Sequence, residues 1–182
     1  EGFDAVGSAA HREAFRAMRR AGLTRVGTAP RPELGENPLF LGCHPFRTTQ
    51  ASSPVDTKVA FGPWMAQRLG GEALVTPTDP EEGDIARAVD AARGRSALVL
   101  GTYNAHVKRG QLRLLAALAG LGLPMACVAL RDPYDLAALP ENVYGLAAYE
   151  YNIESLDTVA QALTGAFVPA GKLPVPLEGG QP

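Results

Sequence analysis

The sequence predicts an α/β fold, a three-layer α/β/α sandwich with a mostly parallel central sheet of the Rossmann-like type. Short apolar runs alternate along the chain with segments of helical periodicity. The runs are apolar at successive positions, as in strands that are buried on both faces. Parallel strands need crossover connections, and the alternating helices supply them.

The composition is that of one ordinary globular domain. The chain has 182 residues, of which 46% are hydrophobic and 20% are charged, and its formal net charge is -2. We expect no nucleic acid and no membrane as partners, because this charge attracts neither phosphate backbones nor anionic lipids. In addition, no apolar run approaches the roughly 20 residues that cross a bilayer. The sequence predicts a soluble domain and leaves open whether it is cytoplasmic or exported.

The amino-terminal segment predicts a lead-in helix that ends at Gly22. His11, Phe15 and Met18 recur on one helical face, while four arginines point elsewhere. We expect residues 1–22 to form this helix. The sandwich domain should then cover residues 23–178, followed by a loose tail at residues 179–182.

The first half of the domain predicts two strands and two helices. In order, these are a buried strand at 39–43, a polar loop at 47–54, a helix at 56–69, a strand at 73–76 and a helix through Ile85, Ala88, Val89 and Ala92. The helix at 56–69 should bend or divide at Gly62-Pro63, because proline cannot donate a hydrogen bond to the preceding turn.

The second half continues the alternation. It predicts a strand at 97–100, a helix through Leu112, Leu115, Ala116 and Ala119, strands at 125–130 and 143–149, and a last helix that buries Leu156, Val159, Ala160 and Leu163. Ser155 is the candidate amino-terminal cap of that last helix. The two cysteines, Cys43 and Cys127, lie in apolar runs where a free thiol acts as a small hydrophobe.

Polar residues gather where the predicted strands end. In an open parallel sheet this edge collects loops and ligands. It should display His44, Thr102, Tyr103, Asn104, Arg131, Asp132, Tyr134, Asp135, Glu150 and Tyr151. The residues could form a surface that faces a sugar or a second domain, or they could cap helices and close turns. The gathering favours a functional surface, since tyrosine and arginine have no particular preference for turns.

The usual cofactor motifs fail, so we expect no cofactor and no bound metal. The residues after Gly101 do not complete the glycine pattern of nicotinamide enzymes. The glycines before Lys172 are spaced one residue too far apart for a phosphate loop, and Leu173 replaces its hydroxyl residue. Cys43-His44 is a single adjacent pair without further ligands at metal spacing.

No catalytic residue can be assigned from the sequence. Asp132, Asp135 and Glu150 could meet at the sheet edge, as the two carboxylates of a glycosidase do. Arg131 adjoins the first of them, which suits a structural ion pair better than a general acid. We expect His11 and His106 to lie on helix surfaces or in packing positions.

Several phrases of the sequence resemble one known family. They are Gly101-Thr102-Tyr103-Asn104, Val128-Ala129-Leu130-Arg131-Asp132-Pro133-Tyr134-Asp135-Leu136, Ala147-Ala148-Tyr149-Glu150-Tyr151 and Gly171-Lys172-Leu173-Pro174-Val175. Together they look like the carboxyl-terminal domain of glycoside hydrolase family three, in its bacterial β-N-acetylhexosaminidase-like branch. The resemblance runs from about Val6 to Leu177 and is loose over residues 28–54.

The resemblance implies a partner domain that carries the chemistry. In the family, an amino-terminal (β/α)₈ barrel holds the aspartate nucleophile, and in this branch also the histidine and aspartate that donate the proton. Neither would belong to this chain. The β-glucosidase branch takes a glutamate from the carboxyl-terminal domain, but Glu150 and Glu154 match that branch too poorly to carry the role. The resemblance thus implies a non-catalytic domain with the barrel and carbohydrate as partners.

Two other functions stay open at this stage. The chain could be a separate module that binds a carbohydrate or another small ligand at the sheet edge. It could also be an oligomerisation domain that buries the polar edge in a homodimer. The fold alone cannot choose among the three, because similar sandwiches host unrelated functions.

Overall fold

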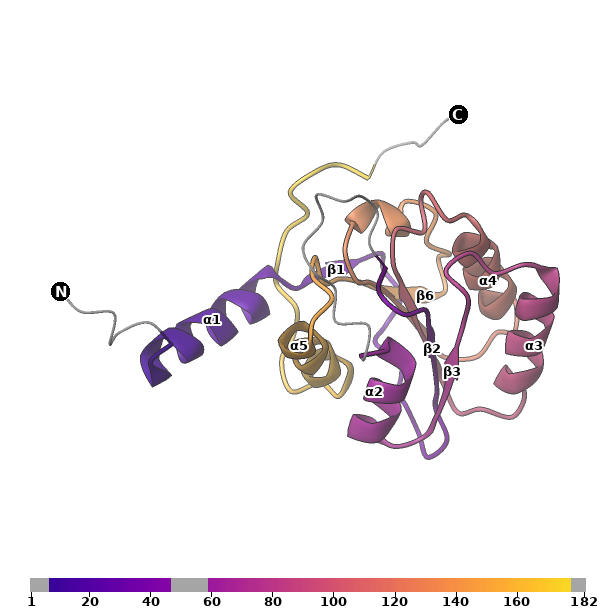
Figure 1. Cartoon of the computed structure of the whole chain (residues 1–182), viewed down its shortest axis with the longest axis horizontal. Helices are drawn as coiled ribbons and strands as arrows, with labels where there is room; N and C mark the ends of the chain where they lie inside the picture. The colour runs from indigo at the N-terminus through magenta and orange to yellow at the C-terminus, as the bar shows by residue number, and fades with distance from the viewer. Residues whose placement is uncertain (1–6, 47–58, 178–182) are drawn as a thin grey trace.

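The computed structural model describes residues 7–46 and 59–177, which form the predicted three-layer α/β/α sandwich (Figure 1). The strands of this part are β1 Thr24–Val26, β2 Leu39–Gly42, β3 Glu72–Val75, β4 Leu98–Thr102, β5 Met125–Ala129 and β6 Val143–Ala147. The helices are α1 Ala9–Gly22, α2 Phe61–Leu69, α3 Glu82–Ala92, α4 Gly110–Ala119 and α5 Ile153–Leu163, with a 3₁₀ turn η2 at Pro133–Leu136. None of these helices is both long and apolar enough to span a bilayer.

The sheet has the order β1-β6-β5-β4-β2-β3 and is parallel except at one edge. The exception is β1, which pairs with β6 antiparallel, Thr24 opposite Ala147. The sequence analysis missed β1 because its three residues give no readable period. Only Thr24 of the three is fully buried.

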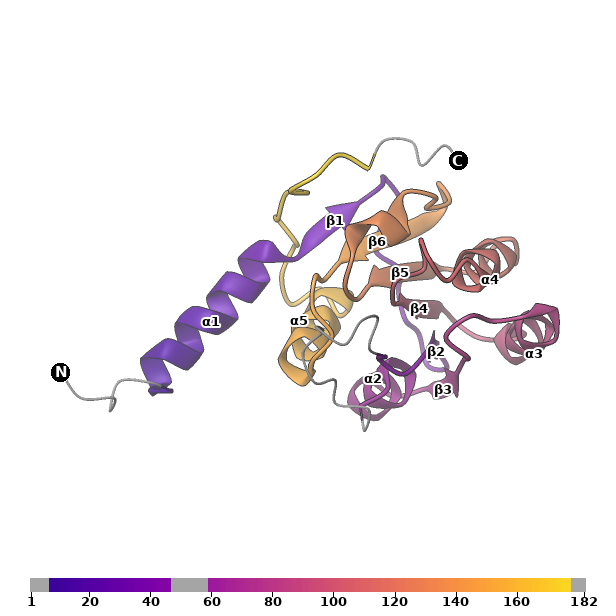
Figure 2. The same ribbon diagram turned by 45° about the horizontal axis from the view of Figure 1, so that its top comes forward.

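Alternate side chains of the central strands pack on opposite faces of the sheet. Phe40 and Val128 join the core under α2 and α5, whereas Leu41 and Cys127 join the core under α3 and α4. Figure 2 shows these two helix pairs on the two sides of the sheet. Burial of both faces explains why the strands are apolar at successive positions.

Helix α2 begins later than predicted and is not divided. Residues 59–60 are not helical, and α2 starts at Phe61, so that Pro63 lies in the first turn. The missing N–H of a proline costs nothing in a first turn, because that group has no partner inside the helix. A side chain at Gly62 would place its Cβ 2.7 Å from the carbonyl oxygen of Phe40, which explains the glycine. The predicted loop at 47–54 and the predicted helical positions 56–58 lie outside the described residues.

Helix α5 is capped by Asn152, not by Ser155 as predicted. The Asn152 side chain accepts a hydrogen bond from the Ser155 backbone N–H at 2.9 Å, which makes Ser155 a residue of the first turn. The preceding strand also ends earlier than predicted, at Ala147. Tyr149 has a left-handed backbone with a φ of 63°, and this conformation cannot continue a strand.

Helix α1 extends away from the body of the domain (Figures 1 and 2) and has no buried residue. Its predicted apolar face is open to solvent, with Phe15 50% and Met18 67% exposed. Ser8 caps its amino terminus by accepting from the His11 N–H at 3.3 Å.

Candidate functional site

The carboxyl ends of β2, β4 and β5 meet at one edge of the sheet because these strands are parallel. From β2 the chain passes to β3, which is the edge strand on one side of β2. It then crosses to β4 on the other side of β2 and continues in that direction to β5 and β6. The switch in direction lies between β2 and β4, and open α/β sheets bind ligands outside such a point. His44 follows β2, and Tyr103 and Asn104 follow β4. The predicted residues from Arg131 to Asp135 follow β5, and Glu150 and Tyr151 follow β6.

Four of the residues expected on display at this edge are buried instead: Thr102, Tyr103, Asn104 and Asp135. The ring of Tyr103 packs edge-on against Phe46 and Tyr151, with centroid distances of 5.1 and 5.6 Å. Asp135 lies in η2 after β5, whereas Tyr103 and Asn104 begin the loop that follows β4. Gln111 holds that loop, accepting from the Tyr103 N–H at 2.9 Å and donating to its carbonyl at 3.0 Å.

Tyr151 joins three segments of the interior. Its hydroxyl accepts from the Phe61 N–H at 2.6 Å and donates to the Cys43 carbonyl at 3.0 Å. Burial raises the pKa of the Tyr151 hydroxyl above its usual value. The residue therefore fixes the start of α2 against the end of β2.

His106 and Asp135 form a pair at the ends of β4 and β5. Oδ1 of Asp135 accepts from the backbone N–H of His106 at 3.0 Å and lies 2.9 Å from its Nδ1. Asp135 is fully buried, and 35% of the His106 side chain is exposed. The sequence analysis placed His106 on a helix surface or in packing, but it lies in a turn before α4 and meets Asp135 across 29 residues. Both residues follow neighbouring parallel strands, and this position in the sequence could have predicted that they lie close together.

The exposed part of the edge is electrically balanced. Nε of Arg131 lies 3.8 Å from Oδ2 of Asp132, which is the structural pair that the sequence suggested. Tyr134 is half exposed, and His44 is also exposed. The carboxylates do not gather in one place: Glu150 pairs with Arg19 of α1 instead.

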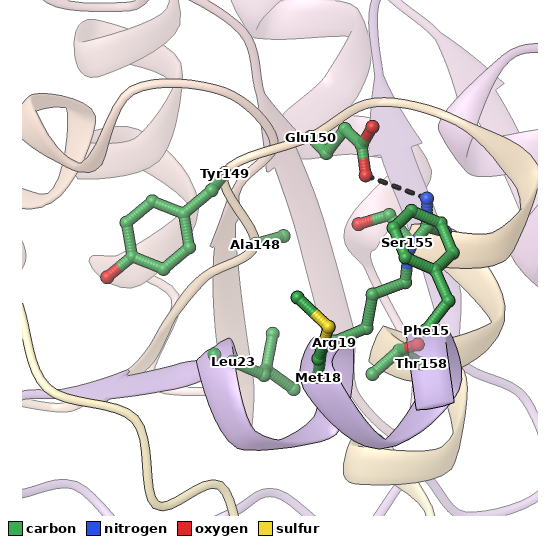
Figure 3. A pocket seen from close by; sticks show the side chains of 10 residues that line it. Phe15, Met18, Arg19, Leu23, Ala148, Tyr149, Glu150, Ser155 and Thr158 are labelled. Carbon is green, nitrogen blue, oxygen red and sulfur yellow. Dashed lines mark ion pairs between the residues drawn. The ribbon is translucent and has the colours of Figure 1, made fainter. Parts of the chain in front are cut away.

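A cavity of about 400 Å³ lies between α1 and the turn that follows β6 (Figure 3). Its lining residues are Phe15, Met18, Arg19, Gly22, Leu23, Ala148, Tyr149, Glu150, Ser155 and Thr158. Arg19 contacts Glu150 at 2.9 Å, Asn152 at 3.0 Å and Glu154 at 3.7 Å, and its guanidinium lies 4.3 Å from the centre of the Phe15 ring.

The turn at this cavity is held in an uncommon conformation. Tyr149, which has the left-handed backbone, donates from its hydroxyl to Oγ1 of Thr24 at 2.9 Å. A left-handed non-glycine residue costs about 1–3 kcal/mol and persists only where its surroundings impose it. The cavity has the volume and mixed polarity of a small-ligand site. Among the described residues that line it, however, Glu150 is the one carboxylate, it is paired with Arg19, and none is a histidine.

The described residues contain no group of three or more histidine, cysteine or acidic side chains that could hold a metal ion. Cys43 and Cys127 are buried free thiols. Burial raises the pKa of the Cys43 thiol to about 12 and that of Cys127 further, so neither is a nucleophile at neutral pH.

The comparisons with known proteins give structural matches only. No protein-family model matches the sequence, and no curated protein matches it. A glycoside hydrolase family 3 β-N-acetylglucosaminidase from Paenibacillus sp. strain FPU-7 aligns with a TM-score of 0.80 and 22% identity, over 97% of this chain and 34% of its own. A fungal multi-domain family 3 β-N-acetylglucosaminidase aligns with a TM-score of 0.75 and 19% identity, over 97% of this chain and 20% of its own.

A β-glucosidase from Listeria innocua also matches, with a TM-score of 0.68 and 17% identity, over 90% of this chain and 26% of its own. The architecture is therefore an α/β/α sandwich of a kind that also forms a part of larger glycosidase chains. More particularly, the chain has the fold of the carboxyl-terminal domain of glycoside hydrolase family 3, which confirms the sequence resemblance at the level of the fold. The chain spans only about a third or less of the length of these proteins.

Proposed function

We propose that this chain is the non-catalytic carboxyl-terminal domain of a β-N-acetylhexosaminidase-like glycoside hydrolase. The parent enzyme would remove terminal β-linked N-acetylhexosamine units from glycans. The observation that supports this most is the alignment of nearly the whole chain with a minor part of two β-N-acetylglucosaminidases, at higher TM-scores than with the β-glucosidase.

The side chains of the described residues support a non-catalytic role. Retaining glycosidases place two carboxyl groups about 5–5.5 Å apart on either side of the scissile bond. Here Glu150 is bound to Arg19 and Asp135 is bound to His106. The nucleophile and the proton donor would come from a preceding (β/α)₈ barrel domain.

Helix α1 supports the presence of a partner domain. Its four arginines and single glutamate give it a formal charge of +3. Because the whole chain has a net charge of -2, the remaining residues together carry a charge of -5. Phe15 and Met18 stand exposed between these arginines. We propose that residues 1–22 connect the two domains and that the exposed Phe15 and Met18 contact the barrel. Residues 23–178 would be the sandwich and residues 179–182 its tail.

Hydrolysis of a chromogenic N-acetyl-β-glucosaminide tests the proposal. The complete polypeptide that contains these residues should release the chromophore, and residues 1–182 alone should not. Activity of residues 1–182 alone would overturn the non-catalytic assignment. Inactivity of the complete polypeptide on N-acetyl-β-glucosaminides, with activity on another β-glycoside, would overturn the substrate class.

The cavity beside α1 supports a second candidate, a separate module that binds a carbohydrate or another small ligand. The coding sequence upstream of Glu1 separates the two candidates. A barrel with an aspartate nucleophile supports the glycosidase domain, whereas a start codon directly before Glu1 supports the module.

A further inference from the structure

Two partly exposed rings lie together at the carboxyl edge of the sheet, away from α1. The ring centroids of His106 and Tyr134 are 6.0 Å apart, with an angle of 62° between the ring planes. The side chain of His106 is 35% exposed and Tyr134 is 47% exposed. The function proposed above assigns no task to either ring.

Asp135 holds the His106 ring in one orientation. Its Oδ1 accepts from the backbone N–H of His106 and also contacts Nδ1 of the ring. The backbone contact alone would close the turn, so the second contact serves to orient the imidazole. In a neutral imidazole whose Nδ1–H is donated to a carboxylate, Nε2 is a hydrogen-bond acceptor.

We propose that His106 and Tyr134 form a binding site for a neutral saccharide, with Asp135 as the positioning residue. One face of a pyranose ring consists of C–H groups, which pack on an aromatic ring such as that of Tyr134. A sugar hydroxyl then donates to Nε2 of His106. Because Asp135 fixes the imidazole in advance, binding loses little side-chain entropy at this contact.

The charges around the two rings favour a neutral ligand. Arg131 and Asp132, in the same segment as Tyr134, are paired and each about two-fifths exposed. They add donors and acceptors without adding net charge, and the buried Asp135 carboxylate adds a negative charge that disfavours anions. Both rings follow parallel strands, β4 and β5, at the carboxyl edge of the sheet, which is the edge where open α/β sheets bind ligands.

NMR spectroscopy of residues 1–182 with labelled histidine and tyrosine tests the proposal. N,N′-diacetylchitobiose is the probe, and this choice alone rests on the proposed function. In the free protein, His106 should be protonated at Nδ1. On titration to about 20 mM, the resonances of His106 and Tyr134 should shift with a Kd in the millimolar range, while those of His11 and His44 should not.

Variants separate binding from folding. Tyr134→Ala changes a half-exposed side chain and should weaken binding at least about tenfold, with an unchanged thermal unfolding midpoint. His106→Gln removes the imidazole that contacts the buried Asp135 and should weaken binding to a similar extent. Asp135→Asn removes the carboxylate that holds the His106 ring, so the ring should no longer be fixed as the Nδ1–H tautomer and binding should weaken to a similar extent. Glu150→Gln, in the cavity beside α1, is the matched control and should leave the affinity unchanged.

Three results would overturn the proposal. They are the absence of shifts at His106 and Tyr134, shifts confined to Tyr149 in the cavity beside α1, and tighter binding of adenosine than of the disaccharide. None of them bears on whether the complete polypeptide hydrolyses N-acetyl-β-glucosaminides, so failure here and failure of the proposed function are distinguishable.

Discussion

Arg19 in α1 and Asn152 at the amino terminus of α5 are joined by a 3.0 Å hydrogen bond across 133 residues of sequence. Asn152 uses the same oxygen to cap α5. The bond therefore ties the protruding helix to the most buried helix of the domain, and α1 has no buried side chain of its own to replace it.

Replacing Arg19 with alanine should loosen α1 without unfolding the sandwich. The side chain is 11% exposed and contacts Asn152, Glu150 and Glu154, so its loss removes most of the polar attachment of α1. The amides of α1 should exchange hydrogen about tenfold faster, equivalent to about 1.4 kcal/mol. Arg16→Ala is the control, because its ion pair with Glu13 is exposed and contributes little. Equal exchange rates in both variants would contradict the role of Arg19.

Replacing Tyr151 with phenylalanine should destabilise the whole domain. The change leaves the Phe61 N–H and the Cys43 carbonyl without their hydroxyl partner. An unsatisfied buried group costs about 1–3 kcal/mol, and urea unfolding should show a loss of that size. Tyr134→Phe, at an exposed ring, should change the free energy of unfolding by less than about 0.5 kcal/mol. An unchanged free energy of unfolding in Tyr151→Phe would show that the two hydrogen bonds do not contribute to stability.

Alanine at Gly101 should also destabilise the domain. A Cβ at this position would lie 2.6 Å from the ring of Phe61, which packs over the switch point of the sheet. Overpacking of this kind costs about 1–3 kcal/mol. A Cβ at Gly83 in α3 would meet nothing within 4 Å. Alanine there should stabilise the domain by about 0.5 kcal/mol, because it reduces the conformational entropy of the unfolded chain. Thermal unfolding of both variants checks the opposite signs.

The two thiols should be unreactive in the native protein. Burial raises the pKa of Cys43 to about 12, so almost no thiolate exists at pH 8. Neither cysteine should react with a disulfide reagent at pH 8, and both should react in guanidinium chloride. Stoichiometric reaction of native Cys43 would contradict its burial.

The same shift should make the domain less stable at alkaline pH. The pKa of Cys43 is higher in the folded state than in the unfolded state, where it is about 9. Its contribution to stability is therefore complete below about pH 9 and is lost as the pH rises toward about 12. Cys43→Ala should flatten the fall of the unfolding free energy with pH in this range. An unchanged slope would assign the fall to other groups, such as Tyr151.

Periodicity predicted most of the fold because the buried elements are long enough to show it. The strands at 39–43 and 125–130 and the helix that buries Leu156 and Leu163 are confirmed. The three residues of β1 could not be predicted, since their place in the sheet depends on pairing with β6, far along the chain. The cap of α5 was misassigned because Asn152 and Ser155 are both good caps and only the backbone conformation distinguishes them.

The candidate site was predicted only as an edge of the sheet. The sequence located the residues that follow the parallel strands, but it could not tell which would turn inward, as Tyr103 and Asp135 do. It also did not include His106 in the site, because the contact of this residue with Asp135 joins two different loops.

The sequence by itself determined the alternation of buried strands and helices, the layers of the sandwich and the resemblance to the family 3 domain, because these depend on hydrophobic patterns and phrases within short segments. Only the tertiary structure decided that Arg19 is shared by two glutamates, that Asp135 orients His106 and that Phe15 and Met18 remain exposed. Each of these depends on the distance between side chains from different elements, which is fixed only when the helices pack on the sheet.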